Sequence, residues 1–151
     1  MSNNDYDKVA HLGFIQGAIN RMAGNSLRCK TWALTLFSAL TAFFFNSEKT
    51  CTNPLIFWLI VTVMLGVFWW MDSWYLWMER LFRKLYDQVR LERGEPSNPY
   101  TMSFAPFIKD EDSILRIMFS LSTCPVYFPL MCVALPMLIN AFAQAAQGWC
   151  K

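Results

Sequence analysis

Asp72 is the only acidic residue in the longest apolar stretch of the chain, where it lies in the string WWMDSWYLWMERLFRKLY. A carboxylate at membrane depth is costly unless it faces protein, a partner or water. We consider two interpretations: Asp72 lines a pore mouth or an intersubunit vestibule, or it pairs with Arg28 or Lys30 and fixes two helices together. At helical spacing Asp72 begins a stripe of polar residues, which comprises Glu79, Arg83, Tyr86 and Arg90.

The basic residues that follow this aspartate predict an anion-binding surface. Such residues could contact the anionic headgroups of lipids or the phosphates of a nucleotide ligand. Acidic residues in the same stretch largely cancel the net charge, so charge alone does not separate these two ligands. The aromatic residues around Asp72 are typical of a membrane interface. The basic set comprises Arg80, Arg83, Lys84, Arg90 and Arg93.

Patterns typical of catalysis are missing from the sequence. The single histidine, His11, has no neighbouring base, nucleophile or metal partner, and we expect it to be solvated or interfacial. The five cysteines lack the paired spacing of a metal site, and there is no glycine-rich phosphate loop. We therefore expect neither an enzyme nor a bound metal or cofactor.

The composition predicts that the chain is embedded in a membrane. Of its 151 residues, 55% are apolar and 16% are charged, whereas a soluble domain is usually nearer a quarter charged. A small soluble protein would also have to bury seven Trp and thirteen Phe. Runs of about 20 apolar residues can cross a bilayer, and the sequence contains such runs. We predict an all-α membrane protein that forms a single domain in a lipid bilayer.

We expect an N-terminal amphipathic helix, three transmembrane helices and a second span that extends into a cytoplasmic helix. Residues 1–30 form the first helix, in the interface or against the spans, and the cluster Gly24–Ser26 permits a bend. Asn53 before Pro54 predicts a helix start, and Asp112 or Ser113 caps a short helix. The spans are 31–46, 54–77 and 121–143, the cytoplasmic helix is 78–93, and the linker is 94–112.

The distribution of basic residues predicts the orientation. Eleven of the thirteen Lys and Arg residues lie before the first span or between the second and third, and such residues mark the cytoplasmic side. The N-terminus is therefore expected in the cytoplasm and the C-terminus outside. Cys51 and Cys150 then lie on the oxidising side, where they either form a disulfide or remain two free thiols.

Two strings, FIQGAINRMAGNSLRCKTWALTL and FWWMDSWYLWMERLFRKLYDQVR, resemble a group of small bacterial membrane proteins. In that group an Asn-Arg-Met and Asn-Ser element precedes the first span, and an aromatic-rich Asp-Ser-Tyr-Tyr, Glu, Phe-Arg, Leu-Tyr element ends the second. The match covers roughly residues 12 to 90. At position 74 this chain has Trp where the group has Tyr, which is a conservative difference. The group is similar to the SLATT-type effectors of anti-phage defence, the Hailong channel effectors among them. The matching residues are Asn20, Arg21, Met22, Asn25 and Ser26 in the first element, and Asp72, Ser73, Tyr75, Glu79, Phe82, Arg83, Leu85 and Tyr86 in the second.

This resemblance implies a homo-oligomeric ion channel, a tetramer, in the bacterial inner membrane. A nucleotide or oligodeoxynucleotide signal, made by a nucleotidyltransferase, would gate it from the cytoplasm and depolarise the cell. The alternative from another functional class is a non-conducting membrane anchor or assembly subunit that recruits a soluble partner through residues 80–93. The residues expected at the pore or gate are Asp72, Glu79, Arg83, Asn20 and Asn25.

Overall fold

The computed structural model describes residues 7–46, 53–92 and 100–149, and within these ranges it contains helices and no strand. The expectation of an all-α protein is confirmed. The helices, in chain order, are α1 (Lys8–Asn46), α2 (Pro54–Leu91), the short 3-10 helix η1 (Ala105–Asp110), α3 (Ile114–Met118) and α4 (Cys124–Trp149).

The first helix is a single element where the sequence indicated a helix, a bend and a separate span. α1 continues without interruption through the Gly24–Ser26 cluster, so the expected bend is absent. The reason lies in its packing, because Ser26 and Cys29 are buried on the same face as Ile15. That face contacts α2 along both halves of α1, which favours a straight helix over one that turns at the cluster.

The start of α2 follows the local signal in the sequence. The side-chain oxygen of Asn53 accepts a hydrogen bond from the backbone N–H of Leu55 at 3.0 Å, and Pro54 occupies the first helical turn. Both features suit a helix N-terminus, where backbone N–H groups lack partners within the helix. The prediction that one helix continues from Pro54 past residue 78 is confirmed.

The far end of α2 lies against the beginning of α1. The last helical residue is Leu91, two positions before the predicted end at 93. The ammonium group of Lys8 donates hydrogen bonds to the backbone carbonyls of Arg90 at 3.0 Å and Glu92 at 2.7 Å. A cation that binds these terminal carbonyls satisfies groups for which the helix offers no donor.

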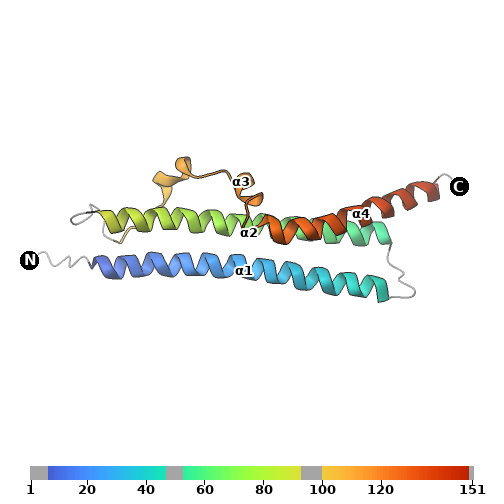
Figure 1. The fold of residues 1–151 in the computed structure, drawn as a ribbon, viewed down its shortest axis with the longest axis horizontal. Helices are drawn as coiled ribbons and strands as arrows, with labels where there is room; N and C mark the ends of the chain where they lie inside the picture. The colour runs from blue at the N-terminus through green and yellow to red at the C-terminus, as the bar shows by residue number, and fades with distance from the viewer. Residues whose placement is uncertain (1–6, 47–52, 93–99, 150–151) are drawn as a thin grey trace, which may run out of the picture.

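Figure 1 shows α1 and α2 as two long antiparallel helices, with α4 beside the first part of α2, α3 near its middle and η1 beside its later part. We call residues 8–30, 78–92 and 100–118 the polar end, and residues 31–46, 54–77 and 124–149 the apolar end. Each end has its own buried cluster. The cluster of the polar end includes Ile15, Ala18, Ile19, Phe82, Leu85 and Val89, and that of the apolar end includes Ala33, Phe37, Trp58, Val61, Leu65, Tyr127, Ala134 and Ala141.

The connection into α4 is built from α3 and a turn. Ser113 is the cap of α3, and its side-chain oxygen accepts from the N–H of Arg116. The buried hydroxyl of Thr123 donates to the carbonyl of Ile117 at 2.8 Å. This turn delays the third long helix, which begins at Cys124 rather than at 121. α4 then continues to Trp149, beyond the expected end at 143.

Two of the described helices, α2 and α4, are long and apolar enough to cross a membrane. The expected spans 54–77 and 121–143 fall largely within these helices. The expected first span, 31–46, lies in α1, which is not among the helices that meet this measure. Polar residues such as Thr31, Thr35 and Ser38 lower the mean hydropathy of this segment.

Candidate functional site

Asp72 lies between α1 and α2 with no exposed surface. The hydroxyl of Ser26 donates to one carboxylate oxygen at 2.5 Å. The ammonium group of Lys30 lies 2.8 Å from both carboxylate oxygens. Arg28, the other partner considered, is exposed. In the single chain, therefore, Asp72 has the geometry of a helix-fixing ion pair.

This ion pair is stabilised by further hydrogen bonds. Lys30 also donates to the hydroxyl oxygen of Ser26 at 2.9 Å, and the side chain of Lys30 remains 18% exposed. The neighbouring hydroxyl of Ser73 donates to the carbonyl of Trp69 within α2. Because a buried charge is costly without a partner, this network fixes the position of α1 against α2 where the polar and apolar ends meet.

The stripe that begins at Asp72 separates into buried and exposed parts. Glu79 is buried and accepts two hydrogen bonds from the guanidinium of Arg83, at 2.6 and 2.9 Å. The side chain of Arg83 is 65% exposed. Further along, Arg90 is exposed and lies 3.4 Å from a carboxylate oxygen of Asp87. The stripe therefore passes from the helix interface to the surface of the polar end.

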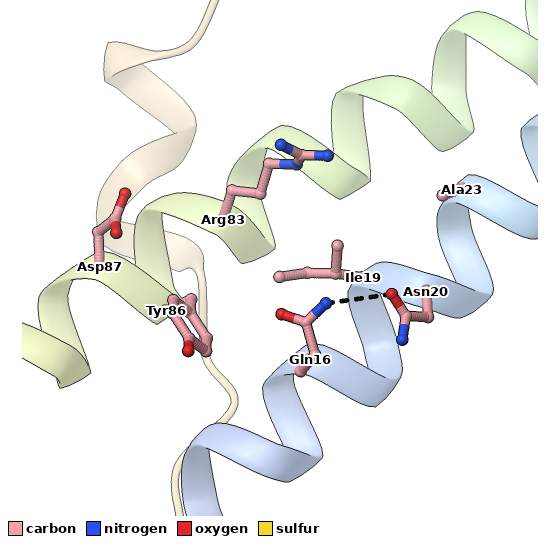
Figure 2. A pocket seen from close by; sticks show the side chains of 7 residues that line it. All are labelled: Gln16, Ile19, Asn20, Ala23, Arg83, Tyr86 and Asp87. Atoms are coloured by element: carbon pink, nitrogen blue, oxygen red, sulfur yellow. Dashed lines mark hydrogen bonds between the residues drawn. The ribbon is translucent and has the colours of Figure 1, made fainter.

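A pocket of about 320 Å³ lies between α1 and α2 at the polar end. Figure 2 shows Gln16 and Asn20 on α1, and Arg83 and Tyr86 on α2, among the residues that line this space. The side-chain nitrogen of Gln16 donates to the side-chain oxygen of Asn20 at 3.1 Å. The lining residues are Gln16, Ile19, Asn20, Ala23, Arg83, Tyr86 and Asp87.

The chemistry of this pocket suits a polar, planar, anionic ligand. The bond between Gln16 and Asn20 leaves one amide oxygen and one amide nitrogen of the pair for a ligand. An amide donor and an amide acceptor of this kind can bind the edge of a nucleobase. The ring of Tyr86 offers a surface for stacking, and Arg83 supplies a cation for phosphate.

A second pocket, of about 290 Å³, adjoins the first because both contain Asn20. Two exposed arginines, Arg21 and Arg28, line it together with Gly24 and Asn25. Neither arginine pairs with a carboxylate among the described residues. Sequence reasoning overlooked this pair, although a spacing of seven residues places both side chains on one face of a helix.

The predicted basic set does not form one surface. Arg80 and Lys84 contact the segment that joins η1 to α3, where Lys84 lies 2.7 Å from Glu111. Arg80 lies 3.8 Å from both Glu111 and Asp112. In contrast, Arg83 faces the pocket beside α1, and Arg93 lies outside the described residues. Each described member of the set is therefore partnered by a carboxylate of the same chain.

The acidic segment that precedes α3 is itself stabilised by an ion pair with a residue of α3. A guanidinium nitrogen of Arg116 donates to the carboxylate of Asp112 at 2.6 Å. This hydrogen bond, together with the positive charges of Arg116, Arg80 and Lys84, holds the pKa of Asp112 below its usual value despite some desolvation. The same bond raises the pKa of Arg116.

The expectation that His11 is solvated or interfacial is wrong. His11 is 1% exposed, and its Nε2 lies 2.9 Å from the carbonyl oxygen of Thr101. Its ring contacts that of Tyr100, with 5.7 Å between centroids, and the hydroxyl of Tyr100 accepts from the backbone N–H of Asp7 at 3.0 Å. The cause is long-range, because the chain after residue 99 folds over the start of α1.

The cysteines divide between described and undescribed parts of the chain. Cys29, Cys124 and Cys132 are free thiols, while Cys51 and Cys150, the pair considered for a disulfide, lie outside the described residues. Within the described ranges, no group of three or more His, Cys, Asp or Glu side chains could hold a metal ion.

No protein-family model, curated protein or solved structure matches this chain. The geometry contributes a buried ion pair at the junction of the two ends and a polar pocket beside it.

Proposed function

We propose that the chain is a homo-oligomeric membrane channel, a pore-forming effector of a bacterial antiviral defence system. Its polar end lies in the cytoplasm and binds a nucleotide or oligonucleotide signal that gates the pore and controls depolarisation of the inner membrane. The observation that carries the proposal is the continuity of α2, which is 38 residues long and joins the polar pocket to the apolar end.

Insertion in the bilayer accounts for the outer surface of the apolar end. α2 exposes Ile60 and Val63, at 60% and 58%, and α4 exposes Phe128 and Ile139, at 57% and 66%. Contact with lipid removes these side chains from water and stabilises the inserted state. The expected topology, with the N-terminus in the cytoplasm, places the two pockets on the side where a nucleotide signal is made.

Several copies of the chain are required for a pore. α1 and α4 both pack on α2, and one buried apolar cluster includes residues of all three helices, so a single chain has no room for an aqueous channel in its core. Their outward faces are available for contacts with further copies and with lipid. We propose a tetramer, in line with the resemblance to the channel effectors.

The signal binds in the pocket between α1 and α2. Its phosphate lies against Arg83, and a base lies against Tyr86 with its edge toward Gln16 and Asn20. A ligand that contacts both helices has a different affinity for each arrangement of the two helices, and this difference is what shifts a gating equilibrium. The ion pair of Asp72 connects the same two helices closer to the apolar end.

Single-channel recording in planar bilayers, with and without candidate oligonucleotides, tests the proposal. We expect the oligonucleotide to alter the open probability, and Tyr86→Leu to remove this response while conductance remains. Arg116→Gln is the matched control, because Arg116 lies on α3 away from the pocket. Binding of the signal should weaken as salt rises, because phosphate contacts release counterions.

The absence of conductance under every condition would overturn the channel proposal. A soluble partner that co-purifies at fixed stoichiometry, without conductance, would instead identify a membrane anchor or assembly subunit. A channel that conducts but is equally insensitive to oligonucleotide before and after Tyr86→Leu would retain the pore and remove the nucleotide signal.

A further inference from the structure

One face of α1 remains exposed and polar along most of the helix. The opposite face is buried against α2 through residues such as Ile15, Ser26, Cys29, Ala33 and Phe37. From Arg21 to Ser38 the exposed polar residues recur at spacings of three, four and seven, and together with Asn20 and Asn46 they form one stripe along the helix. The stripe comprises Asn20, Arg21, Arg28, Thr31, Thr35, Ser38 and Asn46.

The hydroxyl groups of this stripe lie in the part of α1 that belongs to the apolar end. Thr31 donates to the carbonyl of Leu27 at 3.0 Å, and Thr35 donates to the carbonyl of Thr31 at 2.9 Å. Their hydrogens are thus satisfied within the helix, while the oxygen atoms can accept from outside. Hydrocarbon provides no donor for them, whereas water does.

Large apolar residues flank the stripe on both sides. Trp32 and Phe43, each 57% exposed, lie on one side, and Leu34 and Phe45, at 46% and 63%, lie on the other. A helix that borders a pore has this pattern, because its centre contacts water and its flanks contact neighbouring helices. The polar centre also explains why α1 is absent from the helices that qualify as spans by hydropathy.

The charged residues near Arg28 leave an excess of accessible positive charge beside the stripe. Arg28 is exposed and has no carboxylate partner among the described residues. Asp72, the only acidic residue of the apolar end of α2, is buried and neutralised by Lys30. Near the junction of the polar and apolar ends, the charge that solvent can reach is therefore positive. A ring of arginine side chains favours anions in a pore.

We propose that α1 is the pore-lining helix, with Thr31, Thr35 and Ser38 facing the water and Arg28 forming a ring at the cytoplasmic mouth, and that the pore prefers anions. This inference rests on the proposed channel function. It assigns permeation to α1 and leaves Asp72 outside the ion path.

Cysteine accessibility tests the lining. Thr35→Cys and Ser38→Cys are exposed to a membrane-impermeant, charged methanethiosulfonate during single-channel recording, and the unsubstituted chain, with its own five cysteines, provides the baseline. We expect the current to fall irreversibly in both variants. Val63→Cys is the matched control, because Val63 is exposed on α2, and it should respond as the unsubstituted chain does.

Charge reversal tests the mouth. In a salt gradient the reversal potential of the unsubstituted channel should have the sign of an anion-selective pore. Arg28→Glu should shift the reversal potential to the sign of a cation-selective pore. Lys109→Glu reverses an exposed charge on η1 and should leave the reversal potential unchanged. Size-exclusion profiles of all variants should match that of the unsubstituted chain.

The outcomes separate this inference from the proposal on which it rests. No current from the unsubstituted chain would overturn both the channel and the pore-lining helix. A conducting channel in which Thr35→Cys and Ser38→Cys are inert, or in which only Val63→Cys is modified, would overturn the role of α1 alone. A cation preference that Arg28→Glu does not change would overturn the arginine ring.

Discussion

The ammonium group of Lys30 lies 2.8 Å from each carboxylate oxygen of Asp72, across the interface of α1 and α2. In a single chain this contact neutralises the acidic residue that is most unusual in the sequence. The carboxylate has no exposed surface, so the contact favours a role in helix packing over one in ion permeation. That role makes the pair a determinant of stability and assembly.

Asp72→Asn should destabilise the protein strongly. The substitution leaves Lys30 without its counter-charge in a largely buried site, and removing one partner of a buried pair costs about 3–5 kcal/mol. Chemical denaturation in detergent and the size of the assembly provide the measurements. Lys30 retains 18% exposure, so we expect a loss near the lower end of that range.

Two further variants test whether the unpaired charge of Lys30 causes this loss of stability. Glu79→Gln should cost less, because its partner Arg83 is 65% exposed and can be hydrated. The double variant Lys30→Met with Asp72→Leu should be more stable than Asp72→Asn, since it removes both charges. An Asp72→Asn protein with normal stability and altered ion selectivity would contradict the packing role and return Asp72 to the permeation path.

Local signals in the sequence predicted the elements whose limits depend on nearby residues. Asn53 and Pro54 mark the start of α2 as expected, and Ser113 caps α3. The helical periodicity after Met78 correctly predicted that α2 continues beyond its apolar part. Each of these features depends on hydrogen bonds or spacing within a few residues, which a single sequence displays directly.

Contacts between distant residues determined what the sequence could not predict. The sequence left Arg28 and Lys30 as equal candidates for Asp72, and only the rotation of α1 against α2 selects Lys30. Likewise, Lys84 pairs with Glu111, which lies 27 positions later. The basic set appeared to be one surface because the acidic segment that covers part of it belongs to another element.

Trp69→Phe should loosen the attachment of α4. The indole N–H of Trp69 donates to the carbonyl of Met118 at 2.9 Å, and its ring stacks on Tyr127 with 5.9 Å between centroids. Phenylalanine retains an aromatic ring but loses the donor, at a cost of about 1 kcal/mol. The thiol of Cys124 lies at the start of α4 and reports the change through faster alkylation.

The control for this variant is Trp74→Phe, because Trp74 is 43% exposed and contacts the ring of Trp77 on its own helix. Alkylation of Cys124 should remain at the unsubstituted rate in this control. Equal rates in Trp69→Phe and the unsubstituted chain would show that the hydrogen bond to Met118 does not hold the turn.

Lys8→Met should fray the end of α2. The variant removes the donor that binds the carbonyls of Arg90 and Glu92, while it keeps most of the side chain's apolar length. Loss of a charge-assisted bond to terminal carbonyls costs about 1 kcal/mol. Hydrogen exchange should accelerate over the last turn of α2 and remain unchanged near Pro54, whereas uniform exchange in both places would contradict this cap.

Acid should release the segment around α3. The pKa of Asp112 lies below its usual value of 3.8 in the folded protein, chiefly because Arg116 donates a hydrogen bond to it. A carboxyl group whose pKa is lowered by folding stabilises the fold above its unfolded pKa, and this contribution disappears as the pH falls through the folded value. The ion pair with Arg116 should therefore be intact at neutral pH and lost in acid.

Pepsin cleavage of the protein in detergent, followed across the acid range, measures this release. Cleavage near α3 should increase as the pH falls below 3.8. Asp112→Asn should be cleaved more readily than the unsubstituted chain at the upper end of that range, with a weaker dependence on pH. Asp87→Asn, an exposed change on α2, controls for loss of a surface carboxylate. Identical pH profiles for Asp112→Asn and the unsubstituted chain would show that the ion pair between Asp112 and Arg116 does not hold the segment. Removal of the carboxyl group that titrates in this pair would then have had no effect.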